Sequence, residues 1–545
     1  MLDLPFNSRR SPVYGRHGMV ASSQPLATAA GLAILQKGGN AADAAVAAAA
    51  ALNVTEPGST GLGGDAFALY YDQAARQVHA LNGSGRAPAE LTLERLQREG
   101  FGDRLPPLHP YTITVPGACA AWCDLVARFG RLSLAEILAP AIRLAEEGFP
   151  VSPVTAVLWQ RAAEKLLARA QNGRELTING RGPRPGEVFR NPGLARTLRA
   201  ISAGGKEAFY RGAIADAIVA VVRAAGGRLS AKDLTDHTSA WDTPISVTYR
   251  EVRVWECPPN GQGLAALLAL NILEGFDLAE TQPLSAQRLH LVIEALRLAF
   301  ADARHYVADP AFADIPLDDL LSKEYAARRR AGIDVSRAAR DVVHGAPYRA
   351  SDTVYLSVVD GQGNACSFIN SNYMGFGTGI VPQGYGFSLQ NRGAGFTLQP
   401  GHFNALAPGK RPYHTIMPAL ATDAANDELY ACFGVMGGFM QPQGHVQVLL
   451  ALVDDGADAQ AALDRPRLMI PVENEPGPVM LEEGIAAETA AALAQMGHAL
   501  QMVSGYERVI FGRGQIIRRD PGTGVLSAGS DPRADGLAMT WTPEP

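Results

Sequence analysis

The sequence has no concentration of charge of one sign and no obvious surface for a polyanion. Of its 545 residues, 19 % are charged, and the net charge is −6 at pH 7. The two arginine clusters, 328–330 and 518–519, are short enough to be solvated faces of a helix or strand. Nucleic-acid surfaces concentrate Lys and Arg, so we expect no nucleic-acid partner. Apolar residues make up 47 %, which is typical of a globular chain.

Cysteines are few, and no segment is long and apolar enough to span a bilayer. Five scattered cysteines, an odd number, predict reduced and buried thiols of a cytoplasmic protein. Residues 1–20 mix charges and prolines without an apolar core, so we expect no secretion signal. The apolar run 41–52 is far shorter than the ~20 residues that a membrane helix needs. It predicts a buried helix, and we expect no membrane partner.

Several common signatures of enzyme chemistry are missing as well. There is no Gly-x-Ser-x-Gly elbow, no Walker loop, no His-Glu-x-x-His and no Cys-x-x-Cys. The letters of 61–66 fit a permissive dinucleotide fingerprint, but they follow a turn and precede a strand-like run. A tight turn that needs glycine dihedrals is the better interpretation. The sequence therefore predicts no cofactor and no metal site.

Periodicity predicts a mixed helix and sheet protein, built as two lobes or as one large α/β unit. Helices are expected over 24–52, with a break at 38–40, over 116–148 and over 285–307. Residues 336–352 are mixed in charge and lack periodicity, which is typical of an exposed linker.

The character of the chain changes directly after this linker. Residues 353–360 form a β-rich run, 361–364 a turn and 365–370 a second β-rich run, which together predict a hairpin. A further β-rich segment at 429–434 is followed by two glycines and a helix-like stretch, 443–453. Layered sheet and helix are therefore expected after position 353.

Eleven short motifs, in order along nearly the whole chain, resemble the γ-glutamyltransferase family. Each motif is weak alone, but chance does not place so many in sequence. They are 38–44, 115–117, 144–149, 208–212, 243–246, 271–274, 352–365, 376–381, 410–412, 417–418 and 437–438.

The resemblance implies an αββα sandwich of the N-terminal-nucleophile hydrolase class, an α/β fold. Members are made as one precursor that cuts itself before a Thr, which here is the bond between Asp352 and Thr353. A large, helix-rich subunit, 1–352, would include the processing linker at about 336–352. The small catalytic subunit would be 353–545. The two chains would remain partners, and a homodimer of such heterodimers is a further expectation.

The implied nucleophile is Thr353. A Thr hydroxyl is poorly reactive until a base removes its proton, and a new chain terminus supplies an amine with a pKa of about 7.7–8.0. By resemblance, the backbone N–H groups of Gly437 and Gly438 would stabilise the oxyanion. Ser371 stands where the family has a second Thr that bonds the nucleophile, and it keeps the hydroxyl.

The chain departs from the family at the positions that bind substrate. Tyr373, Arg392 and Gly395 replace the side chains that hold the α-amino group of a γ-glutamyl substrate. His414 and Thr415 replace a Ser-Ser pair for the α-carboxylate. The carboxylate-binding Arg maps to Ser84, although Arg86 lies two residues on. The stretch 396–408 is short, so the lid loop of some members is expected to be missing.

These departures predict an amide substrate with a carboxylate. Arg392, Arg86 and His414 suit an anionic acyl group, because Arg forks onto carboxylates. Two readings stay open: a glutathione hydrolase or transferase of glutathione metabolism, and a dicarboxylic-monoamide acylase similar to glutaryl-cephalosporin acylases or oxamate amidohydrolases. A third is an inactive, uncut homologue that only binds.

Overall fold

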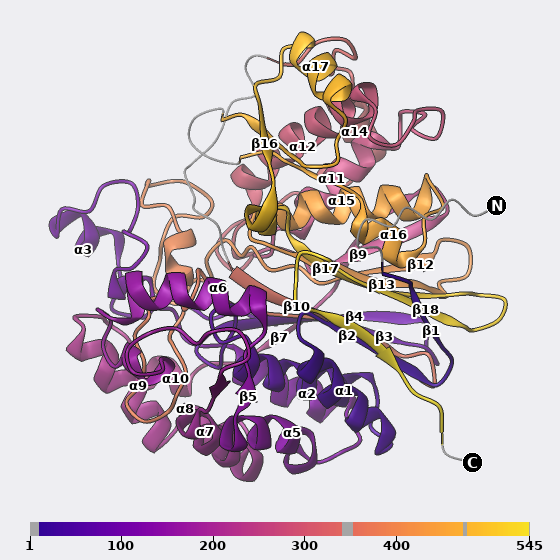
Figure 1. Ribbon diagram of the computed structural model, residues 1–545. Helices are drawn as coiled ribbons and strands as arrows, with labels where there is room; N and C mark the ends of the chain where they lie inside the picture. Colours follow the sequence, from indigo (N-terminus) through magenta and orange to yellow (C-terminus); the bar gives the residue numbers. More distant parts are fainter. Residues whose placement is uncertain (1–9, 340–351, 472–476, 544–545) are drawn as a thin grey trace.

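The computed structural model describes residues 10–339, 352–471 and 477–543, and the chain is built in four layers (Figure 1). Two seven-stranded sheets stack face to face, with β10 of one packed on β13 and β17 of the other. Helices cover the outer face of each sheet. This helix, sheet, sheet, helix order matches the predicted αββα sandwich.

The first sheet is antiparallel throughout, in the order β19-β2-β10-β11-β3-β4-β7. Two alanine-rich helices, α1 (Pro25–Gln36) and α2 (Ala41–Thr55), lie on its outer face. Every residue of α2 is buried, and its small side chains let it lie close to the sheet. In sheet order the strands are Leu537–Thr540, Gly18–Ser22, Asp352–Asp360, Ala365–Tyr373, Asp65–Asp72, Gln77–Gly83 and Ala240–Asp242.

The second sheet is also antiparallel, in the order β1-β18-β17-β13-β12-β9-β8. Its outer face packs on α11 (Gly263–Leu273), α15 (Met440–Val453) and α16 (Ala459–Asp464). In sheet order the strands are Val13–Gly15, Leu526–Ser530, Arg513–Arg519, Leu429–Met436, Ala419–Asp423, Val252–Glu256 and Ile245–Tyr249.

Each sheet combines strands from both sides of position 352. In the first sheet β2, β3, β4 and β7 precede this position, whereas β10, β11 and β19 begin at it or follow it. In the second, β1, β8 and β9 precede it and the other four strands follow. The two halves of the chain therefore share both sheets.

The inner faces of the sheets are closely packed around β10. The ring of Tyr355 lies against Gly434 of β13, where an added Cβ would come within 2.5 Å of the ring. The Tyr355 hydroxyl is hydrogen-bonded to Ser357 and Ser367 at 2.8 and 2.7 Å. A glycine on β13 thus lets a Tyr from β10 fill the space between the sheets.

The structure confirms the segments with strong periodicity. The break predicted at 38–40 separates α1 from α2, and the Asn40 side chain caps α2. The predicted hairpin is the pair β10 and β11. The other predicted helices are α4 (Ala118–Phe129) with α5 (Leu134–Glu147), and α12 (Ala286–Tyr306). Most of the predicted linker, 340–351, lies outside the described residues.

The remaining elements extend the helical layers. Helices α5 and α7 pack beyond α2, and α12 packs on α11. These helices are α3 (Leu93–Arg98), α6 (Pro153–Ala162), α7 (Pro192–Gly204), α8 (Glu207–Tyr210), α9 (Ala213–Ala224), α10 (Ala231–Thr235), α13 (Leu317–Leu320), α14 (Lys323–Arg330) and α17 (Ala487–Gln495). Two small sheets comprise β5 (Phe149–Pro150) with β6 (Val188–Phe189), and β14 (Leu468–Met469), β15 (Val479–Glu482) and β16 (Leu500–Val503).

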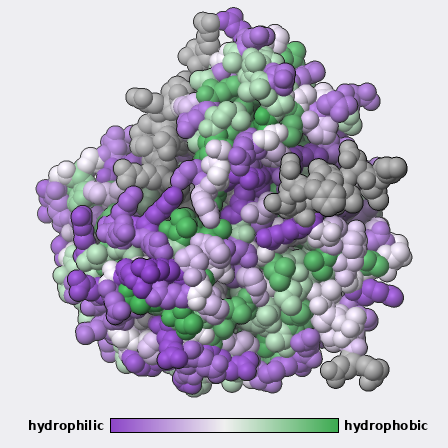
Figure 2. Space-filling view, in the orientation of Figure 1, coloured by the Kyte–Doolittle hydropathy of each residue, from purple (hydrophilic) through white to green (hydrophobic). Residues whose placement is uncertain are grey.

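All five cysteines are buried free thiols, as predicted from their spacing. Within the described residues, no helix has both the length and the apolar character needed to cross a membrane. The face in Figure 2 mixes hydrophilic and hydrophobic residues, with hydrophilic ones along much of its outline.

Candidate functional site

Thr353 is the second residue of β10, and its side chain is fully buried. Its Oγ1 lies 3.1 Å from Oγ of Ser371 on the neighbouring strand β11. The pairing of the two strands is irregular at this point, because Asp352 pairs with Tyr373 while Val354 pairs with Asn370. Such a bulge re-aims the side chain next to it. It brings the Thr353 and Ser371 hydroxyls into contact, as the sequence predicted.

Ser371 connects this pair to a buried cation. Its Oγ accepts hydrogen bonds from the backbone N–H of Tyr373 at 2.8 Å and from Nη2 of Arg392 at 3.3 Å. Tyr373 has a φ of 77°, a conformation that non-glycine residues adopt with strain. Strain of this kind concentrates at functional sites, where surrounding contacts hold it in place.

Arg392 begins the short helix η4 (Arg392–Gly395) and is completely buried. Its Nη1 donates to Oγ1 of Thr415 at 2.8 Å, and its Cζ lies 4.0 Å from the centre of the Tyr373 ring. The stacked ring and the hydroxyls stabilise a guanidinium away from water. The structure therefore gathers three predicted substrate-binding residues, Tyr373, Arg392 and Thr415, beside Ser371.

His414 is adjacent in sequence but is engaged elsewhere. Ile416 N–H donates to its Nδ1, so Nε2 carries the proton and donates to Oδ2 of Asp65 at 3.0 Å. Burial, with a smaller contribution from the Arg392 charge, lowers the pKa of His414 to about 4. A neutral imidazole with both nitrogens occupied orients Asp65 and does not offer a cation to a substrate.

Arg86 also has partners within the protein. Its Nη1 lies 3.5 Å from Oδ2 of Asp309 and donates to the carbonyl of Gly409 at 3.1 Å. Ser84, the other position considered for this role, is buried and accepts from the side chain of Asn260. The geometry favours Arg392 over Arg86 and His414 as the cation of the site.

Gly437 and Gly438 lie between the end of β13 and the start of α15. Their φ values, 139° and 61°, are both in the region that favours glycine. Gln262 donates from Nε2 to the carbonyls of Gly438 and Thr415, at 2.9 and 2.6 Å. This amide therefore fixes the glycine pair relative to the Arg392 cluster. The N-terminus of α15 that follows is a favourable place for negative charge.

A buried ion pair near Thr353 escaped the sequence analysis. Arg513 on β17 pairs with Glu56 at 2.9 Å and donates to the carbonyl of Thr353 at 3.5 Å. Glu56 also accepts from the hydroxyls of Ser23 and Ser59. Burial raises the pKa of Glu56, and the Arg513 charge opposes that shift. In the sequence, only the position of Glu56 at the start of the glycine-rich passage could have indicated that its carboxylate is part of the site.

That glycine-rich passage is explained by close backbone contacts. A Cβ on Gly63 would come within 2.1 Å of the carbonyl oxygen of Ser388, and one on Gly64 within 2.2 Å of that of Ser371. The loop thus lies directly against the end of β11. Its glycines bring the loop backbone next to Ser371, which supports the turn interpretation.

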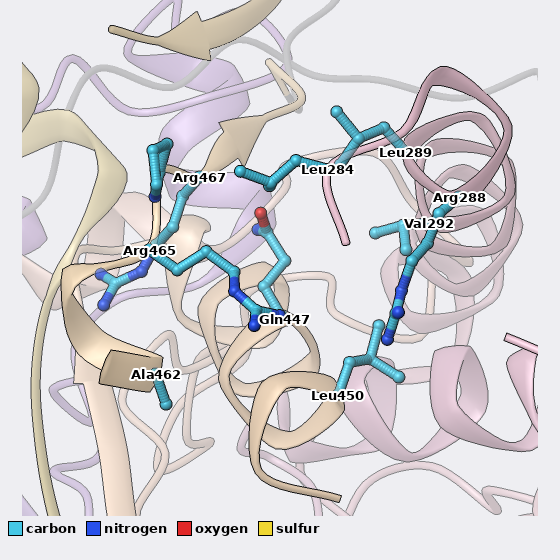
Figure 3. Close-up of a pocket in the computed structure, with 10 residues that line it drawn as sticks. Leu284, Arg288, Leu289, Val292, Gln447, Leu450, Ala462, Arg465 and Arg467 are labelled. Atoms are coloured by element: carbon cyan, nitrogen blue, oxygen red, sulfur yellow. The ribbon is translucent and has the colours of Figure 1, made fainter. Parts of the chain in front are cut away.

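A small cavity of about 30 Å³ lies away from these residues, between α12, α15 and α16 (Figure 3). Three arginines line it, and each is paired: Arg288 and Arg465 with Asp455, and Arg467 with Asp531. None of its lining residues is a predicted site residue. A space of this size holds about one water molecule.

Known proteins match the chain over nearly its whole length. A sequence model of the family described as gamma-glutamyltranspeptidase matches residues 27–541. The glutathione hydrolase-like YwrD proenzyme of Bacillus subtilis is 37 % identical, covering 97 % of this chain and 99 % of the relative. The oxamate amidohydrolase proenzyme of Klebsiella pneumoniae is 34 % identical, covering 96 % and 98 %.

A solved structure is equally similar in its fold. The crystal structure of a cephalosporin acylase from Bacillus halodurans superposes with a TM-score of 0.91 at 47 % identity, covering 99 % of this chain and 98 % of that one. The predicted αββα sandwich of the N-terminal-nucleophile hydrolases is therefore confirmed.

Proposed function

We propose a function from one premise: the chain belongs to the gamma-glutamyltranspeptidase family. It is a self-processing amidase, cut between Asp352 and Thr353 into a large subunit, 1–352, and a small subunit, 353–545. Relatives described as proenzymes support the cleavage. The residues that carry the chemistry, and the substrate, are our proposals.

One observation carries this assignment. A Thr at the start of a central strand has its hydroxyl 3.1 Å from a second buried hydroxyl, that of Ser371, which Arg392 also contacts. An ordinary strand Thr has no need of this arrangement. Buried polar groups are held in such networks where a defined position matters.

Cleavage gives Thr353 a free amine beside its own hydroxyl. The amine takes the Oγ1 proton, and Oγ1 attacks the amide carbon of the substrate. An amine at a chain terminus has a pKa of about 7.7–8.0, so part of it is neutral and available as a base near neutral pH.

The tetrahedral oxyanion accepts hydrogen bonds from the N–H groups of Gly437 and Gly438. When it collapses, the C–N bond breaks and the amine leaves with the proton that Thr353 had taken. Water then hydrolyses the ester on Oγ1 and releases the acid. An amine in place of water would give transfer of the acyl group.

Arg392 defines the substrate class in this proposal. In the uncut chain Asp352 of β10 lies opposite Tyr373 of β11 in the strand register. Cleavage after Asp352 frees that residue to move away from the stacked Tyr373 and Arg392. The cation can then meet a carboxylate on the acyl part of an amide. Monoamides of dicarboxylic acids fit best. A γ-glutamyl group would also bring an ammonium next to Arg392, which the like charge disfavours.

A panel of glutaryl, succinyl, oxamate and γ-glutamyl amides tests this preference. We expect turnover to be highest for an amide without an α-ammonium group. Efficient hydrolysis of γ-glutamyl-p-nitroanilide, exceeding that of the glutaryl anilide, would favour the second candidate, a glutathione hydrolase. The Bacillus subtilis relative, by its name glutathione hydrolase-like, keeps that candidate open.

Arg392→Met should lower kcat/KM for the preferred anionic amide by about 10- to 150-fold, the equivalent of one charge-assisted hydrogen bond. Arg392→Lys keeps the charge without the planar fork and should recover part of the loss. Steady-state kinetics on charged and neutral acyl anilides measure both. An equal loss on the neutral acyl anilide would contradict a role in substrate charge recognition.

Ser371→Ala should reduce kcat about 10- to 100-fold, because one hydrogen bond to the nucleophile is lost and the Tyr373 N–H is left buried without its acceptor. Ser371→Thr restores a hydroxyl and serves as the matched control. Stopped assays on purified, fully cut enzyme separate this effect from slow processing. If Ser371→Ala retains wild-type kcat, the hydroxyl pair is only structural.

An inactive binding protein is the remaining alternative. It predicts a single uncut band on a denaturing gel of the purified protein, whereas the proposal predicts two. The cytoplasmic location and the dimer of cut heterodimers stay predictions. Size-exclusion chromatography of the cut protein tests the dimer.

A further inference from the structure

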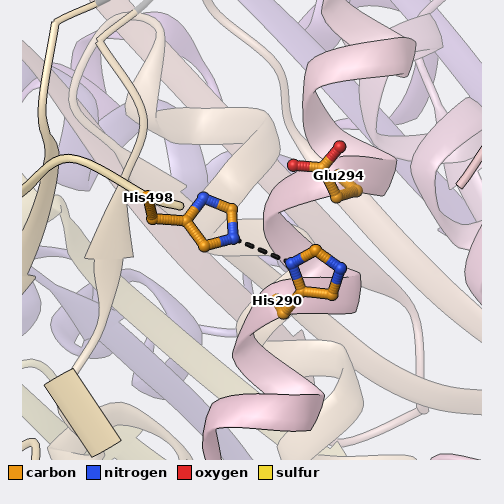
Figure 4. Close-up of side chains that lie close together, drawn as sticks. All are labelled: His290, Glu294 and His498. Atoms are coloured by element: carbon orange, nitrogen blue, oxygen red, sulfur yellow. Dashed lines mark hydrogen bonds between the residues drawn. The ribbon is translucent and has the colours of Figure 1, made fainter. Parts of the chain in front are cut away.

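Two histidines and a glutamate meet far from the candidate site (Figure 4). His290 and Glu294 are one turn apart on α12, so they share a face of the helix. His498 follows α17 and is 208 residues from His290 in sequence. All three side chains are buried, and one ligand atom from each lies within 4.8 Å of the others.

The hydrogen bonds fix which nitrogen of His290 has a free electron pair. Its Nε2 lies 2.7 Å from the carbonyl oxygen of Asp334, so Nε2 carries the proton. Its Nδ1 then presents an electron pair to Nε2 of His498, at 2.8 Å. An imidazole oriented by a carbonyl at its other nitrogen is typical of a metal ligand.

His498 supplies a second observation. Its Nδ1 is buried and has no hydrogen-bond partner among the described residues. With the hydrogen on Nδ1 instead of Nε2, the Nε2 electron pair would point to the same place as that of His290. In the metal-free protein the hydrogen on Nε2 of His498 lies between the two nitrogens, and a cation that replaced this hydrogen would bind both electron pairs.

Glu294 completes the group as the acidic ligand. Its Oε1 accepts from Arg297 at 2.8 Å and its Oε2 from the backbone N–H of Ala339 at 3.2 Å. An ionised carboxylate has about four acceptor positions, so both contacts can persist while one oxygen binds a cation. The negative charge also compensates part of a divalent charge.

We propose that His290, Glu294 and His498 form a site for a divalent transition metal, with Zn²⁺ as the best fit to two imidazoles and one carboxylate. Two nitrogens bound to a tetrahedral zinc at about 2.0–2.1 Å are roughly 3.3 Å apart. The present 2.8 Å between Nδ1 of His290 and Nε2 of His498 therefore needs only a small rotation of the side chains.

The position of the site suggests its effect. Ala338 N–H donates to the carbonyl of Met496, and Ala339 contacts Glu294, so residues 338–339 are held at the same place. If the chain is cut at position 352, as proposed above, His290 and Glu294 belong to the large subunit and His498 to the small one. The metal would then cross-link the two chains, a role that rests on the proposed cleavage.

The experiment uses the full-length protein, purified, freed of metal with EDTA and dialysed. After addition of Zn²⁺ and gel filtration, elemental analysis should find one Zn²⁺ per 545-residue precursor, or per pair of subunits in the cut protein. The melting temperature should rise. Co²⁺ in its place should give the visible absorption of a tetrahedral cobalt site. Glu294→Gln and His498→Ala should lose the metal and the shift. His305→Ala, an exposed histidine on the same helix, should retain both.

An uncut Thr353→Ala protein separates this proposal from the proposed function, since it should still bind Zn²⁺ while lacking activity. In the cut protein, EDTA should lower the urea concentration at which the two chains separate. Failure of wild type to retain Zn²⁺ and to give the Co²⁺ spectrum would overturn the site. Equal retention by Glu294→Gln, His498→Ala and wild type would overturn it too. If the protein binds the metal but EDTA does not change the urea concentration at which the chains separate, the metal does not cross-link the two chains.

Discussion

Thr353→Ala should yield a single uncut polypeptide with activity at least roughly 10⁴-fold below wild type. The same hydroxyl is proposed to attack the peptide bond after Asp352 and, once freed, the substrate amide. Removing a catalytic nucleophile typically costs between about 10⁴- and 10⁶-fold. A denaturing gel and intact-mass measurement report the cleavage, and hydrolysis of the preferred amide reports the activity.

Thr353→Ser is the matched control, because it keeps the hydroxyl and the short distance to Ser371. It should be cut, although more slowly, since Ser lacks the methyl group that restricts the Thr rotamer. A cooperative thermal unfolding transition of the Ala variant would show that its uncut chain is folded. Active wild-type enzyme with an intact chain across positions 352 and 353 would overturn the mechanism and the subunit boundaries together.

Arg513→Met should destabilise the protein by about 3–5 kcal/mol, because it leaves the Glu56 carboxylate buried without its cation. Both partners are at most 5 % exposed, so water does not replace the lost charge. The variant also loses the contact to the Thr353 carbonyl, and cleavage should slow. Denaturant unfolding of the uncut Thr353→Ala background measures the stability without the complication of two chains.

The stability that Arg513→Met loses should increase as the pH rises. Burial already raises the pKa of Glu56 above its ordinary value of 4.5, and loss of Arg513 raises it further. The unfolded chain releases the proton near that ordinary value, so the deficit of the variant is small at pH 4.5 and grows as the pH rises. Glu56→Gln/Arg513→Met should recover most of the stability. A pH-independent deficit, or no recovery, would contradict the ion-pair explanation.

Local sequence patterns predicted the elements that frame the site. The hairpin at 353–370 and the helices on either side of 38–40 follow from alternation, a turn and a capping residue within a few positions of each other. The contact between the hydroxyls of Thr353 and Ser371 was expected from the family resemblance, and the two strands of this hairpin bring the two residues together. Local sequence patterns are sufficient where the structural element is formed by residues that are close in the sequence.

Residue pairs that the fold brings together from distant parts of the chain could not be predicted from the sequence. Glu56 and Arg513 are 457 residues apart, and His414 and Asp65 are 349 apart. His414 was expected to contact the substrate as a cation. That expectation used only its neighbours in the sequence, which do not reveal that Asp65 lies beside its imidazole. Nothing in the spacing of such pairs indicates that the fold will bring them within hydrogen-bond distance.

The sharing of both sheets by the two halves of the chain limits how the protein can be made. If the chain is cut as proposed, neither product alone contains a complete sheet, and β10 has β2 on one side only through the other chain. Synthesised separately, residues 353–545 would expose unpaired strand edges, which promote aggregation. We therefore expect the chain to need covalent continuity while it folds and to be stable without it afterwards. Co-expression of the two halves as separate genes should give far less active enzyme than the single precursor.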